Sequence, residues 1–210
     1  DRLRDVVALA GPQVEAKPGD WIVETADAVA VVSAEEGYVL DYGLRGQPDG
    51  IIYVEPAVWD AFDLVRGEVS SIEGVGGTIH VTRRMRTRDV VHHTWVWLEG
   101  TKLRIDSQLV GVGEKGALAI GLGEIVRWGN TLTWAEGRGV MDHGGSFGTD
   151  FIGRTAHGMS YAMRGLDGPF ITRFGWPEFP GFWTAARNTM RPMRPKPLMP
   201  ILMVMRFPPG

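Results

Sequence analysis

The amino-acid sequence predicts an all-β fold, an antiparallel β-sandwich or supersandwich with few short helices. Short stretches rich in Val, Ile, Thr and aromatic residues alternate with turn residues along most of the chain, as is typical of sandwiches and barrels. The 210 residues include 29 Gly and 13 Pro, which suits a chain with many turns. Eight Trp and a hydrophobic fraction of 44% supply the side chains for a large core.

The N-terminal part of the chain predicts short strands separated by polar turns. Residues Asp1–Ala10 suit a short helix or an arm. Alternating or continuous apolar residues then predict strands at Trp21–Glu24, Ala28–Val32, Tyr38–Asp41 and Ile51–Pro56. The apolar spacing of Ala57–Val65 suits two helical turns or a loop that covers the core.

The centre of the chain carries the longest predicted strands. Apolar and polar residues alternate over Thr78–Arg86, Val90–Glu99 and Lys102–Val110. The sequence Glu-Gly-Thr-Lys between the last two predicts a tight hairpin turn. Gly116–Val126 is more continuously apolar, which predicts a buried strand.

The C-terminal part predicts a few further strands and a segment of different composition. Strand patterns occur at Met159–Gly165, Pro169–Phe174, Phe182–Met190 and Ile201–Phe207. Residues 187–210 are rich in Pro and Met and carry five basic residues and no acidic one. We therefore expect a β-sandwich domain over 1–186 and a basic C-terminal segment over 187–210, which we expect to be either solvated or docked on a partner.

Bulk charge and composition exclude several classes of protein. The net charge of −3 argues against a general nucleic-acid binder. The absence of Cys excludes disulfides, thiolate metal sites and catalysis by Cys. No apolar run approaches the roughly 18 residues of a membrane span. We expect no cofactor and no metal.

One Gly-rich stretch, Gly123–Arg154, together with His157 just after it, holds the best candidate site. It combines Trp128 and Trp134 with acidic, basic and imidazole side chains, namely Asp142, His143, Asp150, Arg154 and His157. Aromatic rings stack on the apolar faces of sugars, and acid, His and Arg side chains can bind hydroxyls or transfer protons. The alternative is that this stretch forms turns, in which Asp150 and Arg154 make a structural ion pair.

Three other motifs have simpler interpretations. Gly111–Gly116 fits G-x-G-x-x-G, but a strand pattern follows it, which favours a turn over a dinucleotide site. His92 and His93 are adjacent on a strand and so point to opposite faces; we expect one to be buried and hydrogen-bonded and the other solvated. The alternative is a metal site that His80 and His92 share across a hairpin. Alternation should likewise split the basic run Arg83–Arg88 over two faces.

Two blocks of sequence resemble a known group of domains. Gly19–Gly43 with Asp49–Pro56, and Leu122–Gly139 with Thr149–Arg154 and Gly158–Met163, are similar to β-supersandwich domains of large exported bacterial proteins of lipoprotein type. The resemblance covers about residues 18–165. It implies a topology like that of galactose mutarotase, and a periplasmic, outer-membrane-associated or extracellular location. It maps no catalytic residue onto this chain.

The sequence therefore leaves two functions open. The first is a non-enzymatic exported module that binds a glycan or a protein, or serves as a structural subunit of a larger assembly. The second is a carbohydrate-active enzyme of epimerase or lyase type, with Asp142, His143, His157 and Glu124 around a pocket. The Trp content and the absence of a nucleophile motif favour the first.

Overall fold

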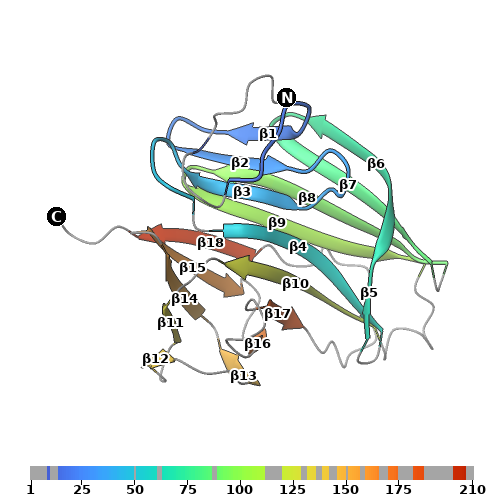
Figure 1. The fold of residues 1–210 in the computed structure, drawn as a ribbon. Coiled ribbons are helices and arrows are strands. Elements are labelled where there is room, and N and C mark those ends of the chain that lie inside the picture. Colours follow the sequence, from blue (N-terminus) through green and yellow to red (C-terminus); the bar gives the residue numbers. More distant parts are fainter. Residues whose placement is uncertain are drawn as a thin grey trace.

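The computed structural model describes residues 9, 14–49, 51–60, 63–86, 89–111, 120–128, 132–135, 139–141, 146–149, 151–156, 159–165, 170–174, 182–186 and 201–206. These residues form two antiparallel sheets (Figure 1). The first sheet has the order β1 (Trp21–Glu24), β2 (Ala28–Val32), β3 (Val39–Leu44), β4 (Ile51–Asp60), β10 (Ile120–Trp128), β17 (Phe182–Ala186), β16 (Phe170–Phe174) and β13 (Ser146–Thr149), with β5 (Asp63–Val65) also paired to β4. The second sheet has the order β12 (Gly139–Met141), β11 (Leu132–Ala135), β14 (Phe151–Ala156), β15 (Met159–Gly165), β18 (Ile201–Arg206), β9 (Lys102–Val110), β8 (Val91–Glu99), β7 (Thr78–Met85) and β6 (Gly67–Val75).

The predicted fold class is confirmed. The described part of the chain is all-β and contains no helix, and its two antiparallel sheets fit a β-sandwich. The helical alternative for residues 57–65 was wrong, because this stretch holds the end of β4 and all of β5. Short apolar runs suit a buried strand as well as a helical turn, and strand pairing on both sides of β4 decides between them.

The central hairpin also follows the sequence prediction. β8 and β9 pair from Val91 with Val110 to Glu99 with Lys102. Gly100 closes the turn with a φ of 59°, a conformation that favours glycine. The basic run divides between the faces as expected, since Arg83 is buried and Arg84 is exposed.

The main core lies between the two sheets, where β1 and β2 pack over β7 and β8 (Figure 1). Small branched side chains of the first sheet meet every second residue of β7, β8 and β9, including Ile79, Val81, Val96 and Ile105. Each buried aliphatic side chain of this kind stabilises the fold by roughly 1.5–3 kcal/mol. The alternate residues of these three strands consequently lie on the outer face of the second sheet.

Tyr42 joins the two sheets inside this core. Its ring is fully buried, and its hydroxyl donates to the carbonyl of Thr101 at 2.6 Å. The same oxygen accepts the backbone N–H of Leu103 at 3.3 Å. The polar end of this buried tyrosine thus has partners at the β8–β9 turn and the start of β9, which links β3 of the first sheet to β9 of the second.

The first sheet is covered on its other face by the segment that precedes β1. Leu9 and Ala16 pack there against Val29 and Val31. This cover explains why every residue of β2 is buried, although only one face of the strand points to the main core. The carboxylate of Asp41 fastens the cover, because it accepts the backbone N–H groups of Glu15 and Ala16 at 2.8 and 2.7 Å.

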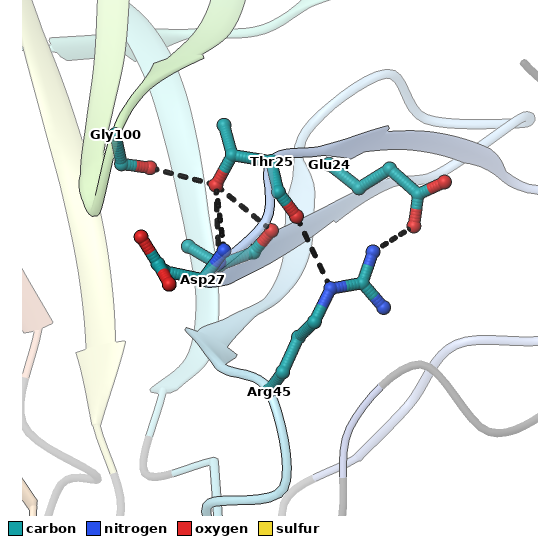
Figure 2. A network of polar contacts seen from close by, with 6 residues as sticks. Glu24, Thr25, Asp27, Arg45 and Gly100 are labelled. Carbon is teal, nitrogen blue, oxygen red and sulfur yellow. Dashed lines mark hydrogen bonds and ion pairs between the residues drawn. The ribbon is translucent and has the colours of Figure 1, made fainter.

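A polar network closes one end of the sandwich (Figure 2). The hydroxyl of Thr25 accepts the backbone N–H of Ala28 at 3.1 Å and donates to the carbonyl of Gly100 at 2.9 Å. Arg45 donates to the carbonyl of Thr25 at 3.1 Å and pairs with Glu24. The β1–β2 turn is therefore tied to the β8–β9 turn of the opposite sheet.

Part of the predicted C-terminal segment belongs to the second sheet. β18 lies between β15 and β9 and pairs with both, and Figure 1 shows it in red beside the green β9. The remaining residues of 187–210 lie outside the described part, so the division at residue 186 stays a prediction. No helix among the described residues has the length and apolar character needed to cross a membrane.

Candidate functional site

Only three of the seven residues of the predicted Gly-rich site lie in the described part of the chain. Trp128 is the last residue of β10, Trp134 lies in β11 and Arg154 in β14. The other four, Asp142, His143, Asp150 and His157, lie outside the described residues. The site as a whole therefore stays a prediction.

The described members of that site fall on different sheets. Trp128 lies opposite Ile51 in the first sheet, where the register shifts between Arg127 and Trp128. Trp134 lies opposite Gly153 in the second sheet, one register position from the pair of Thr133 and Arg154. Trp128 and Trp134, six positions apart in the sequence, thus lie in different sheets, which short-range spacing does not reveal.

The outer face of β6, β7, β8 and β9 carries a second set of aromatic and polar residues. Cross-strand pairing arranges them in three rows, which are Val75–Thr78–Trp97–Arg104, Glu73–His80–Trp95–Asp106 and Ser71–Thr82–His93–Gln108. We call these twelve residues the outer grid. Because the alternate residues of these strands fill the core, the outer grid faces away from the first sheet.

Three rings of the outer grid stack on one another. The rings of His80 and Trp95 lie 4.8 Å apart between centroids and are inclined by only 3°. The His93 ring is 5.2 Å from His80 and 5.8 Å from Trp95, with inclinations of 19° and 20°. His80 on β7 therefore covers one face of the two rings that β8 contributes.

The two imidazoles also share a hydrogen bond. Nε2 of His80 lies 3.0 Å from Nδ1 of His93, and the hydroxyl of Thr82 lies 3.4 Å from the same His93 nitrogen. Burial, followed by the charge of His93, lowers the pKa of His80 below its ordinary value of 6.5. A neutral imidazole pair can both donate and accept hydrogen bonds, which suits recognition of uncharged hydroxyls.

Trp97 occupies the next row of the outer grid without a stacked ring. Among the described residues no aromatic or cation contact involves its ring. On the same row, Val75 is 74% exposed, although large exposed apolar side chains are scarce in this part of the chain. Arg104, on the other side of Trp97, pairs with Glu99. Trp97 and Val75 thus lie in one row of the outer grid, with Thr78 between them and Arg104 at the end of the row.

The histidine predictions have mixed outcomes. His92 is buried, with its Nε2 3.4 Å from the hydroxyl of Thr94, whereas His93 is on the outer face, as expected for neighbours on a strand. The suggested partnership of His80 with His92 was wrong, because the register places His92 opposite Arg83 and brings His80 to His93. The described residues contain no group of three or more side chains arranged to hold a metal ion.

A second polar cluster lies on the inner face of the same strands. Arg83, His92, Thr94 and Ser107 are each at most 5% exposed. Arg83 donates to the hydroxyl of Thr94 at 3.3 Å and to the carbonyl of Glu36 at 3.2 Å. No local motif marks this cluster, although Arg83 follows Ile79 and Val81 on the same face of a predicted strand, which indicates a buried charge.

The buried carboxylates of the first sheet serve the fold. Asp20 accepts the backbone N–H groups of Lys17 and Ala34, each at 2.9 Å, and so closes two turns. Asp49 accepts the backbone N–H of Tyr42 at 3.2 Å. Asp41 holds the covering segment, and burial raises its pKa. Each of these carboxylates accepts backbone N–H groups in the interior, and Asp41 also shares a side-chain hydrogen bond with Asp49, so they stabilise turns and the covering segment.

Comparison with known proteins identifies the fold alone. No protein-family model matches the chain, and no curated protein matches its sequence. The crystal structure of the Slr1438 protein from Synechocystis sp. PCC 6803 is similar to this chain, with a TM-score of 0.52 over 90% of this chain and 96% of that one. The two sequences are 7% identical, so the likeness concerns a shared all-β architecture.

Proposed function

We propose that this protein is a non-enzymatic binding module and that the outer grid of β6–β9 binds a glycan. The observation that carries the proposal is Trp97 on the outer face of β8, in the row next to the stacked rings of His80, His93 and Trp95. Sugar rings present apolar C–H faces and hydroxyl edges, and this combination matches an aromatic face with neighbouring hydrogen-bonding groups.

The polar members of the outer grid supply both kinds of hydrogen-bonding group. Glu73 and Asp106 flank the row of His80 and Trp95, and Gln108 lies opposite His93. Carboxylates accept from sugar hydroxyls, whereas amide and imidazole groups both donate and accept. A sheet face also holds such groups more rigidly than a loop does, which lowers the entropy lost on binding.

The proposed location and family of the protein are argued from the sequence alone. An exported location and membership of the supersandwich domains of large bacterial proteins are proposed on the two blocks of resemblance described above. The enzymatic alternative depends on Asp142, His143, His157 and Glu124. Of these four, only Glu124 lies in the described part of the chain, so the enzymatic alternative stays a prediction.

A glycan array with paired variants tests the proposal. We expect the full chain to bind a defined set of glycans, and Trp97→Ala to abolish that binding. Val75 and Val110 on the outer face give a matched pair, because they are 74% and 47% exposed. They lie about 20 Å apart along the strand direction, from the rise of roughly 3.3 Å per residue.

The expected pattern is weakened binding in Val75→Ala and unchanged binding in Val110→Ala. Trp134→Ala, in the Gly-rich stretch, should also bind normally. Circular dichroism and a thermal melt establish that each variant is folded. Binding lost in Trp134→Ala and kept in Trp97→Ala would move the site to the Gly-rich stretch. Absence of binding to every glycan on the array would contradict a sugar ligand.

A further inference from the structure

The inner cluster of Arg83, His92, Thr94 and Ser107 has no role in the proposed glycan face. The four residues occupy neighbouring register positions, with Arg83 opposite His92 and Thr94 opposite Ser107. All four point into the sandwich, because Val81 and Ile105 on the same face belong to the main core. Burying polar groups at such a depth lowers the stability of the fold unless these groups form hydrogen bonds or ion pairs.

Arg83 has only neutral hydrogen-bond partners among the described residues. Its two bonds are to the hydroxyl of Thr94 and the carbonyl of Glu36, and no described carboxylate makes an ion pair with it. Burial lowers its pKa to about 10, and the negative group that opposes this shift is Glu55.

Glu55 is already engaged by another cation. Both of its carboxylate oxygens accept from Arg66, at 2.9 Å from Nε and 3.1 Å from Nη2. Two guanidinium groups therefore share one carboxylate. His92 adds no charge at neutral pH, because burial and then the charge of Arg83 lower its pKa to about 3. Arg83 is thus a buried positive charge without a carboxylate partner of its own among the described residues.

Ser107 offers an unused hydroxyl to the same interior. Its Oγ is buried and has no hydrogen-bond partner. Its cross-strand neighbour Thr94 accepts from Arg83, so Ser107 lies one strand away from the guanidinium. The hydroxyl of Ser107 is thus a buried donor without an acceptor, one strand away from a guanidinium whose opposing carboxylate is bound by Arg66. One small anion would complete this arrangement.

We propose that this cluster binds a single small monovalent anion through the guanidinium of Arg83 and the hydroxyl of Ser107. The shared chemistry is one compact negative acceptor, supplied either by a halide ion or by the carboxylate of a small organic acid. Apolar neighbours such as Val81, Ile105 and Met85 exclude water and strengthen the attraction between the two charges. The site is separate from the outer grid, since it lies on the opposite face of the sheet.

Anion-dependent stability tests this proposal on the full chain. Thermal unfolding midpoints are measured against increasing sodium chloride, sodium bromide and sodium acetate, with sodium isethionate, a bulky sulfonate, holding the ionic strength constant. An anion bound only by the folded state raises the midpoint in proportion to the logarithm of its concentration, once the site is mostly filled. A rise with the halides assigns the site to a halide, and a rise with acetate alone assigns it to a carboxylate.

Two variants locate the effect. Ser107→Ala should be at least as stable as the wild type in isethionate, because it removes an unpaired hydroxyl, yet should lose most of the anion-dependent rise. Arg83→Met should lose it entirely. Ser71→Ala, on the outer face, is the control and should keep the full rise. If Arg83→Met does not fold, Ser107→Ala alone still tests whether the inner cluster binds the anion. Equal midpoints in all four salts, or a full rise in Ser107→Ala, would overturn the proposal.

Discussion

Nε2 of His80 lies 3.0 Å from Nδ1 of His93, so the two imidazoles of the outer grid share one hydrogen bond across β7 and β8. One nitrogen must donate and the other accept, which requires at least one of the rings to be neutral. The stack with Trp95 holds both rings in place. This relationship makes the outer grid sensitive to protonation.

The first prediction concerns the pKa of His80. We expect it to lie below 6.5 in the wild type, because of burial first and the charge of His93 second. Replacing His93 by Gln removes the second cause only. His93→Gln should therefore raise the pKa of His80 part of the way towards 6.5. A ¹⁵N NMR titration of the imidazole nitrogens measures it, and an unchanged value would contradict the coupling.

The second prediction concerns stability in acid. The pKa of His92 is about 3 in the folded protein and near 6.5 when unfolded, so the unfolded chain binds an additional proton between these values. The stability contributed by neutral His92 is present above pH 6.5 and is lost as the pH falls towards 3, by up to about 1.4 kcal/mol per pH unit. Urea unfolding at pH 7, 6, 5 and 4 measures this loss. His92→Gln, which does not titrate, should show a shallower slope.

The third prediction compares two glycines that both have a positive φ. At Gly37, with φ of 71°, a Cβ would come within 2.6 Å of Cγ1 of Val81 and 3.0 Å of Nη2 of Arg83. At Gly46, with φ of 73°, it would meet no atom within 4 Å. Gly46→Ala should cost roughly 1–2 kcal/mol from backbone strain alone. Gly37→Ala should cost about 1–3 kcal/mol more from overpacking.

Chemical denaturation of both variants checks this comparison. Similar losses for Gly37→Ala and Gly46→Ala would show that the Ser33–Tyr38 turn does not press on Val81 and Arg83. A larger loss at Gly37 would agree with a turn that closes directly over the inner cluster.

The fourth prediction concerns the covering segment of the first sheet. Asp41→Ala removes the acceptor of the Glu15 and Ala16 amides and should destabilise the fold by about 1–3 kcal/mol. Amide hydrogen exchange should show lost protection at these two residues, while β7 and β8 keep theirs. Uniform loss across the sandwich would instead mean that the segment does not open separately.

The sequence was most informative where one face of a strand is buried. β1, β2 and β9 begin and end at the predicted residues, because alternation or continuous burial marks each of them. β6 was not predicted, because neither of its faces is clearly buried. It is the edge strand of the second sheet, mostly exposed, so its sequence Gly-Glu-Val-Ser-Ser-Ile-Glu-Gly-Val lacks a clear apolar period.

Part of the proposed binding face could be predicted from the sequence. Trp95 and Trp97 are two residues apart on a predicted strand, which places both on one face. Their partners His80, Arg104 and Val75 depend on the register of three hairpins, and spacing within one strand does not determine that register. For the same reason, no local motif predicts the hydrogen bond from Arg83 to Thr94 or the position of Ser107 opposite Thr94.

The most direct test of the glycan-binding account follows the indole N–H signals of the tryptophans by NMR. The chain has eight Trp, so single-residue variants can assign each signal. During titration with a glycan selected on the array, the account predicts that the signals of Trp95 and Trp97 shift with one common dissociation constant. Shifts confined to Trp128 and Trp134, with Trp95 and Trp97 unaffected, would contradict the outer grid as the binding face.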